Sequence, residues 1–509
     1  MARESSPGVL ARLPLFLLLT GCAALSMYVP AIYAVVQDNH PASQSFFYAG
    51  TLGLICVTLV ALALGAREPR YGALGQLLSL FATFTFLPLF LAVPVHDALR
   101  NTSFLNAYFD MVSAVTTTGA NIYENPARLS DPLHLWRAQV AWLGGMLMWI
   151  AAAAILAPLS LGGFEVTARA APGRGDGLSY MGQTDARKRL SNVAAALIPT
   201  YAGLTVVVWI ALIVTGDSSL VALSHAMSVM STSGISPVGG LGGAQSGLGG
   251  EVVLFFFMFF ALSRLTFAND TVSLGQGRLD KDPEFRIGIV LVVGVPVLLF
   301  LRHWLGAYDV AAAEDGLRAL KAFWGSMFTV MSFVTTTGFE SNDWDTAQRW
   351  SGLETPGLIL MGLALIGGGV ATTAGGVKLL RVFALYLNGL REMERLVHPS
   401  SVGNGPMGSL RIRRDGAFLA WIFFMMFAMS LACVTVVLAA LGVGFDQAIL
   451  LSIAMLSTTG PLIEMAAETP VRLAELSAAS KLVLCGAMVL GRLETLAIVA
   501  LVTTDFWRN

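Results

Sequence analysis

Four short runs of threonine and serine each end in a glycine, and their residue types and spacing suggest a specific chemistry. Glycine permits dihedrals that place successive carbonyl oxygens on one side of such a run. Several runs around one axis could replace the water shell of a dehydrated cation. They are Thr116, Thr117, Thr118 and Gly119; Ser231, Thr232, Ser233 and Gly234; Thr335, Thr336, Thr337 and Gly338; and Ser457, Thr458, Thr459 and Gly460. We call them filters one to four, and they predict an ion-conducting protein.

The composition places these filters in a membrane. The 509 residues are 55% hydrophobic and only 12% charged, with a mean hydropathy of +0.70, which is too apolar for an ordinary soluble fold. A formal net charge of −1 gives no basic surface for nucleic acid. The four cysteines are widely spaced within apolar stretches, so they predict neither a metal site nor a disulfide framework.

Ten apolar segments are near the roughly 20 residues that a membrane-spanning helix requires. They are 14–36, 46–66, 75–96, 135–158, 191–214, 251–270, 287–304, 356–388 with a break, 417–441 and 479–504. Four segments that lead into the filters are too short to cross: 104–115, 219–230, 320–334 and 446–456. We interpret them as re-entrant half-helices, which membranes tolerate only where protein or water surrounds the broken backbone.

The order of span, half-helix, filter and span occurs four times. The predicted fold is an all-α polytopic membrane protein with four tandem helix–pore loop–helix repeats around a pseudo-fourfold pore, preceded by two extra transmembrane helices. The parts are 1–70 for the two leading helices and 71–165, 190–272, 284–390 and 415–509 for the repeats. A lipoprotein cleavage box at Leu19–Cys22 is an alternative, but the apolar run continues to Val36.

Basic residues concentrate in the loops on one predicted side, around 67–70, 169–189, 278–286 and 391–414. This bias is expected of cytoplasmic loops. We therefore expect a multi-pass membrane protein with both termini cytoplasmic and the filters entering from outside. Acids after the filters, such as Glu340 and Glu464, either steer cations or are ordinary solvated loop charge.

The segment 356–388 is a poor helix interior because it contains six glycines between Gly362 and Gly376, each costing about 1 kcal/mol relative to alanine. We predict that the chain unwinds there, although close glycine packing between helices is an alternative. The number of residues that separates each filter glycine from this break, or from one of two arginines, is nearly the same, so we expect all three at a similar depth in the membrane. Gly338 to Gly369 is 31 positions, Gly460 to Arg492 is 32 and Gly234 to Arg264 is 30.

We hypothesise that Arg492 and Arg264 flank the cavity below the filters. One or both would hold the unwound segment shut by hydrogen bonds to its free carbonyl oxygens. For Arg264 the alternatives are snorkelling to the inner interface or pairing with Asp270.

Motifs outside the filters match a known family. They are Leu135-Trp136-Arg137 with Trp142-Leu143-Gly144-Gly145, Lys281-Asp282-Pro283-Glu284-Phe285-Arg286, Ala371-Thr372-Thr373-Ala374-Gly375-Gly376-Val377-Lys378 with Arg381, Leu396-Val397-His398-Pro399, Gly491-Arg492-Leu493-Glu494, and Phe506-Trp507-Arg508. With four filters in this order, the chain resembles the Trk/Ktr/HKT superfamily of potassium uptake proteins from end to end. The two leading spans favour the Trk-type membrane subunit over the shorter Ktr branch.

The resemblance implies uptake of K+, coordinated by the filter carbonyls, with no organic cofactor in this chain. It implies an intramembrane gating loop at 367–378, with assigned residues Gly367, Gly368, Gly369, Thr372, Thr373, Gly375, Gly376 and Lys378. It also implies a location in the bacterial cytoplasmic (inner) membrane, a separate cytosolic nucleotide-binding regulatory subunit (TrkA-like) and a homodimer. Because each filter has one glycine, we expect looser selectivity than in a tetrameric potassium channel, so that Na+ or Rb+ could pass.

Other functions are less consistent with the sequence. An intramembrane enzyme would need paired aspartates, a Ser/His pair or an HExxH site, but the six histidines are scattered at loops or helix ends. We therefore expect no enzymatic activity. A transporter for an organic solute would favour inverted repeats, whereas these repeats share one orientation. The nearest alternatives are the potassium-binding subunit of a P-type pump and a sodium or other monovalent-cation transporter on the same fold.

Overall fold

The computed structural model describes residues 13–64, 73–159, 161–167, 186–263, 282–306, 316–353, 355–398, 414–467 and 469–494. Regular structure in these ranges is entirely helical. Seven of the described helices are long and apolar enough to cross a membrane, and shorter apolar helices lie between them. The all-α polytopic architecture expected from the sequence is thus confirmed.

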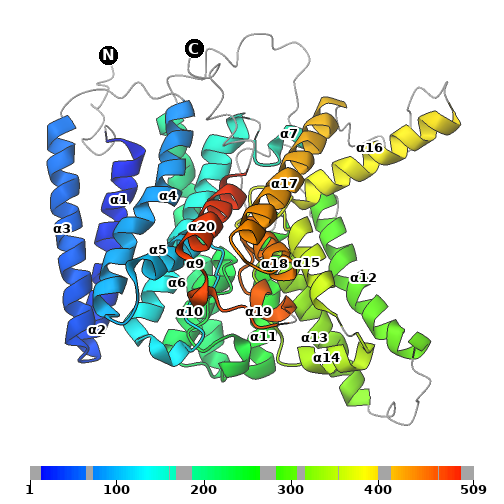
Figure 1. The fold of residues 1–509 in the computed structure, drawn as a ribbon, viewed down its shortest axis with the longest axis horizontal. Coiled ribbons are helices and arrows are strands. Elements are labelled where there is room, and N and C mark those ends of the chain that lie inside the picture. Colours follow the sequence, from blue (N-terminus) through cyan, green and yellow to red (C-terminus); the bar gives the residue numbers. More distant parts are fainter. Residues whose placement is uncertain are drawn as a thin grey trace.

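Two spans precede the repeats, as predicted. The first is divided at Met27 into α1 (Leu15–Ser26) and α2 (Tyr28–Val36). Pro30 has no N–H to donate to the carbonyl of Ser26, which interrupts the helix at this point. The second span, α3 (His40–Leu64), lies at one edge of the molecule (Figure 1).

Each repeat contains a long first helix, a half-helix and a second helix. The first helices are α4 (Ala73–Ala98), α9 (Ala186–Thr215), α12 (Pro283–Gly306) and α17 (Arg414–Ala440). The half-helices are α5 (Phe104–Val115), α10 (Ser219–Ser231), α13 (Gly316–Val334) and α18 (Phe445–Leu456). The second helices are α6 (Asp131–Ala151), α11 (Gly247–Met258), α15 (Gly357–Ile366) and α20 (Ala478–Leu493). Every half-helix ends at its filter, where the sequence placed it.

The second helix of each repeat packs against the half-helix of the next repeat. The contacts are α6 with α10, α11 with α13, α15 with α18, and α20 with α5. Because the last contact returns from repeat four to repeat one, the four repeats form a closed ring.

The ends of the half-helices next to the filters are fully enclosed by protein. Every residue of α5 from Phe109 to Val115 is buried, and so is every residue of α18 from Leu450 to Leu456. In contrast, only 17% of the apolar window of α3 is buried, because that helix faces outward. Broken backbone therefore lies where protein surrounds it, as a membrane requires.

Three of the second helices, α6, α11 and α15, lose regular α-helical geometry beyond the filters. α6 continues as a π-turn at Ala152–Leu156, and α11 continues as a 3-10 turn at Phe259–Ala261. α15 gives way to a loop at 367–378, followed by α16 (Leu379–Val397), which extends away from the bundle (Figure 1). The predicted span ends at 264–270 and 495–504 lie outside the described residues.

Three short helices complete the described structure. They are α7 (Phe164–Thr167), α14 (Trp344–Ser351) and α19 (Leu462–Ala466). α14 and α19 follow filters three and four, on the opposite side of the molecule from the distal part of α16 (Figure 1). They therefore belong to the face through which the half-helices enter.

Candidate ion pore and intramembrane loop

The same unusual backbone conformation occurs at the centre of all four filters. The φ angles of Thr117, Thr232, Thr336 and Thr458 are 55°, 52°, 55° and 53°. A left-handed conformation is rare for a β-branched residue and persists only where the surroundings impose it. Its fourfold recurrence shows that the filters share one loop structure, which residue types alone did not specify.

Two sets of hydrogen bonds impose this conformation. The N–H of the third filter residue donates to a carbonyl of the half-helix, as in Thr118 to Ser113 at 2.8 Å and Thr459 to Ala454 at 2.8 Å. The hydroxyls of the first and third residues also contact each other, at 2.8, 3.0, 2.9 and 3.3 Å in filters one to four. These filter donors are therefore directed toward the filter's own side chains and half-helix.

The carbonyls of the central threonines remain available. In the described part of the chain, the carbonyl oxygens of Thr117, Thr232, Thr336 and Thr458 accept no hydrogen bond. Buried carbonyl oxygens without a donor are costly unless another partner satisfies them. A dehydrated monovalent cation is such a partner.

The filters contact one another in ring order. A Cβ added to Gly119 would overlap the carbonyl of Ser233, and one added to Gly234 would overlap that of Thr337. A Cβ on Gly338 would lie 2.8 Å from Pro461, and one on Gly460 would overlap the backbone of Ala120. Each filter glycine thus lies against the next filter or the residue that follows it, with no room for a side chain.

Filter four departs from the other three. Gly119, Gly234 and Gly338 have φ angles of 69°, 66° and 83°, whereas Gly460 is not in the left-handed region. The N–H of Gly460 instead donates to the carbonyl of Thr118 in filter one, at 2.6 Å. The glycine of filter two is left-handed like those of filters one and three, although the sequence of filter two also differs from theirs.

The glycine-rich segment is unwound, as expected from its composition. α15 ends at Gly367, whose φ is 73°, and Gly376 has a φ of 78°. The loop folds back on the helix end, since Val377 N–H donates to Leu365 and Lys378 N–H donates to Ile366, both at 2.9 Å. These two hydrogen bonds hold the loop at 367–378 close to the end of α15, beside the filters.

The loop contacts the deep ends of three filters. The N–H of Gly375 donates to Thr336 Oγ1 at 2.7 Å, and Thr373 Oγ1 donates to the carbonyl of Met230 at 3.3 Å. A Cβ on Gly375 would overlap the carbonyl of Ser457. Met230 directly precedes filter two, Thr336 is the second residue of filter three, and Ser457 is the first residue of filter four. Because each half-helix runs inward before its filter returns, the loop contacts the deep ends of these filters.

Arg492 holds the loop from repeat four. Its Nη1 donates to the carbonyl of Thr373 at 2.6 Å, and the side chain is only 3% exposed. This is the kind of contact hypothesised from the sequence. Arg264 lies outside the described residues, so its predicted role remains untested.

Other residues hold the loop from neighbouring elements. Gly369 N–H donates to the carbonyl of Ala261 at 2.9 Å, and Val370 N–H donates to Glu284 Oε1 at 2.9 Å. Lys378 Nζ donates to the carbonyl of Ala374. The role of Glu284 was not predicted, although an acid at the start of an apolar span is a recognisable signal in a sequence.

A buried ion pair lies where the loop joins α16. Arg381 Nη2 and Glu494 Oε2 are 2.6 Å apart, and the guanidinium of Arg381 lies 3.4 Å from the ring centroid of Phe423. Glu494 directly follows α20. The pair therefore connects the start of α16, which follows the loop, to the end of α20 in repeat four.

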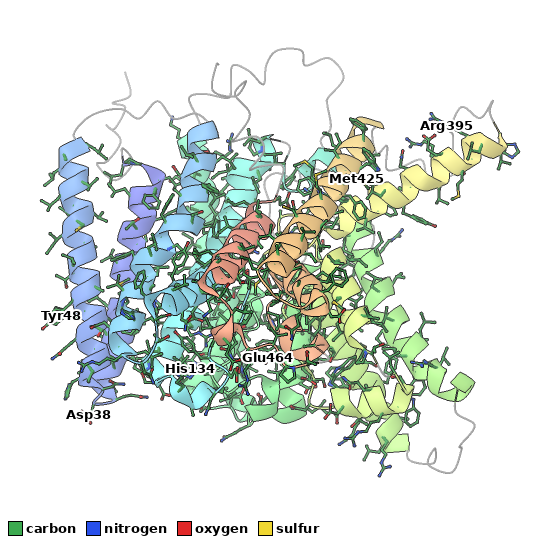
Figure 2. All side chains as sticks on the ribbon, viewed as in Figure 1. Asp38, Tyr48, His134, Arg395, Met425 and Glu464 are labelled. Atoms are coloured by element: carbon green, nitrogen blue, oxygen red, sulfur yellow. The ribbon has the colours of Figure 1, made fainter. Side chains whose placement is uncertain are left out.

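Acids lie on the opposite side of the filters from the loop. In Figure 2, Glu464 on α19 lies on the same side as Asp38, and Arg395 on α16 lies on the other side. Burial, together with the neighbouring carboxylates of Asp345 and Glu464, raises the pKa of Glu340 to about 7. Glu340 follows filter three by two positions, so its charge changes beside the filter near neutral pH.

One histidine is placed differently from the sequence expectation. His225 lies within half-helix α10 rather than at a helix end, and it is fully buried. Its Nε2 is 2.8 Å from Ser236 Oγ, two residues beyond filter two. It therefore supports the exit of that filter.

Comparison with known proteins places this architecture in a family. The family model TrkH, described as a cation transport protein, matches residues 253–506. The Trk system potassium uptake protein TrkH of Halomonas elongata is 30% identical over 414 residues, covering 79% of this chain and 80% of that protein. The chain belongs to the TrkH family.

Two further TrkH proteins extend the match to almost the whole chain. TrkH of Salmonella typhimurium is 29% identical over 495 residues, covering 95% of this chain and 96% of that protein. The crystal structure of the potassium transporter TrkH from Vibrio parahaemolyticus has a TM-score of 0.79 at 26% identity, covering 98% of this chain and 100% of that chain. These matches do not favour the pump-subunit alternative.

Proposed function

We propose that this chain is the membrane subunit of a potassium uptake system and that K+ crosses through the ring of four filters. The observation that carries the proposal is the ring itself, in which four filters share a left-handed threonine and expose carbonyls without donors. Curated relatives in the same family are potassium uptake proteins. Membership of this transporter family also makes an ion transporter, rather than an enzyme, the natural assignment.

The filter backbone is the proposed ion site. Carbonyls of the sixteen filter residues are the proposed replacement for the water around K+. The central threonines contribute oxygens that accept no hydrogen bond in the described structure, whereas the carbonyls of Thr118, Thr459 and Gly460 each accept one from a backbone N–H. The half-helices direct the negative ends of their dipoles toward the same axis, which favours a cation. The departure of Gly460 supports looser selectivity, so Na+ and Rb+ are the ions to compare with K+.

The loop at 367–378 is the proposed gate. It contacts Thr336, Met230 and Ser457 at the deep ends of the filters, where it would block an ion. The contact between Arg492 and Thr373 would hold it closed. Opening would require the loop to break its hydrogen bonds to Thr336, Met230 and Arg492 and to move away from Ser457.

A cytosolic partner would supply the signal for opening. We assign this role to a nucleotide-binding regulatory subunit (TrkA-like) that docks on basic loops at 169–189 and 391–414, much of which lies outside the described residues. This places both termini on the cytoplasmic side of the bacterial inner membrane. Assembly as a homodimer is part of the same proposal.

Complementation of a bacterial strain that lacks potassium uptake tests the function. With its regulator present, the unmodified chain should restore growth at low potassium. Gly119→Ser should abolish this growth, because Gly119 has a φ of 69° and its Cβ would overlap the carbonyl of Ser233.

Gly203→Ser is the matched control, since a Cβ at that helical position meets nothing within 4 Å. It should grow like the unmodified chain. Failure of the unmodified chain to restore growth, despite its presence in the membrane, would count against potassium uptake. Normal growth with Gly119→Ser would count against the filter as the ion site.

A further inference from the structure

The chain that leaves filter three is held by a carboxylate from repeat two. Glu251 lies on α11 and is only 2% exposed. Its Oε1 accepts a hydrogen bond from the N–H of Asn342 at 2.7 Å. Its Oε2 accepts from Trp324 Nε1 and from Ser341 Oγ, both at 2.8 Å.

All three partners of Glu251 are donors. Among the described residues, no basic side chain lies within ion-pair distance of it. A buried carboxylate persists in such a place only when hydrogen bonds replace its hydration. The three donors supply that replacement, and two of them come from the segment just beyond filter three.

This segment is fixed on other sides as well. Phe339, the first residue after Gly338, lies edge-on to the ring of His225, with centroids 5.4 Å apart. Gly325 on α13 leaves no room for a Cβ beside the carbonyl of Asp343. The exit of filter three is therefore clamped between its own half-helix and two residues of repeat two.

Filter one is supported differently. Arg137 contacts Asp110 at 2.9 Å and Asn121 at 3.3 Å, and all three residues belong to repeat one. The fold of the repeats is shared, but the side chains that hold the filter exits are not. Glu251 thus makes the geometry of filter three depend on a neighbouring repeat.

We propose that Glu251 is a positioning residue for filter three, holding the chain after Gly338 so that the filter carbonyls keep the spacing that the ion requires. The inference rests on the proposed potassium uptake, because the KM for K+ is the measurement that reports the geometry of the filter. It adds to that proposal a residue that contacts no ion and acts from a different repeat.

The test is a substitution with a designed compensation. In Glu251→Gln the amide oxygen can accept from Asn342, but the NH2 group then opposes the N–H of Trp324. We expect the KM for K+ to rise about tenfold, the size typical of one lost hydrogen bond to a charged group. Trp324→Phe removes the opposing donor, so the double variant should largely regain the KM of the unmodified chain.

Potassium uptake and its inhibition by sodium are measured for each variant, normalised to the amount of protein in the membrane. Glu475→Gln is the charge-matched control, because Glu475 is 68% exposed after filter four. It should leave KM unchanged. A loss of folded protein alone would lower the maximal rate without changing KM.

An unchanged KM and unchanged sodium inhibition in Glu251→Gln would overturn the inference. The inference predicts that Trp324→Phe restores the KM of Glu251→Gln. A double variant whose KM is as high as that of Glu251→Gln, or higher, would therefore also overturn it. If Glu251→Gln does not reach the membrane, Ser341→Ala removes one donor and must raise KM, or the inference fails. Uptake by the unmodified chain is measured in parallel, so failure of the proposed function is seen separately.

Discussion

The central threonine of each filter illustrates how single residues are held in place for ion binding. A β-branched residue in the left-handed region stores on the order of 1–3 kcal/mol of strain. The bond from the third filter residue to the half-helix and the contact between the two flanking hydroxyls offset this strain. The result is a carbonyl that has no donor in the described structure and is kept in one orientation before an ion arrives.

Glu340 gives a prediction at the residue scale. Its pKa is raised to about 7 by burial and by Asp345 and Glu464, so it is mostly neutral at pH 6 and mostly charged at pH 8. A negative charge at the filter entrance attracts cations. The KM for K+ should therefore fall as external pH rises from about 6 to 8.

Glu340→Gln should remove this pH dependence and fix KM near its acidic value. Potassium uptake into proteoliposomes at varied external pH checks the expectation. Glu124→Gln is the control, because Glu124 is an exposed carboxylate in the loop after filter one. An identical pH profile in Glu340→Gln and the unmodified protein would rule out this role.

The intramembrane loop shows what an element adds to its residues. Its glycines allowed the break in α15 to be predicted, because a helix interior disfavours them. The partners of the loop could not be predicted, since Ala261 contributes only a backbone carbonyl and Thr336 was expected to serve the ion. Contacts made through backbone atoms leave no pattern in residue types.

Arg492→Ala gives the prediction for this element. Loss of the bond to Thr373 removes roughly 1.5–3 kcal/mol from the closed arrangement, so uptake without the regulator should increase at least about tenfold. Flux of Rb+ into proteoliposomes that contain the membrane subunit alone measures this. Arg472→Ala, which removes an exposed arginine after filter four, should have no effect. Unchanged flux in Arg492→Ala would show that Arg492 does not hold a gate.

In the whole molecule, repeat four contacts repeat one at two levels. Helix α20 packs against α5, and filter four hydrogen-bonds to filter one. Hydropathy and the four filters predicted four repeats, because spans and half-helices differ in length. They did not predict the closing contacts between α20 and α5 and between Gly460 and Thr118, which depend on packing across more than 300 residues. Ser457 and Pro461 distinguish filter four in the sequence. Filter two differs as well, so residue types did not show which of the two backbones would depart from the others.

Because the filters join all four repeats, ion binding should stabilise the protein as a whole. A ligand that binds only the folded state at 100 times its dissociation constant adds about 2.7 kcal/mol to stability. The purified protein should therefore unfold at a higher temperature in KCl than in choline chloride at equal ionic strength. Gly119→Ser should abolish this difference, whereas Gly203→Ser should retain it. Equal unfolding temperatures in the two salts would mean that the ring does not hold K+ at equilibrium, and NaCl in the same assay would compare occupancy by sodium.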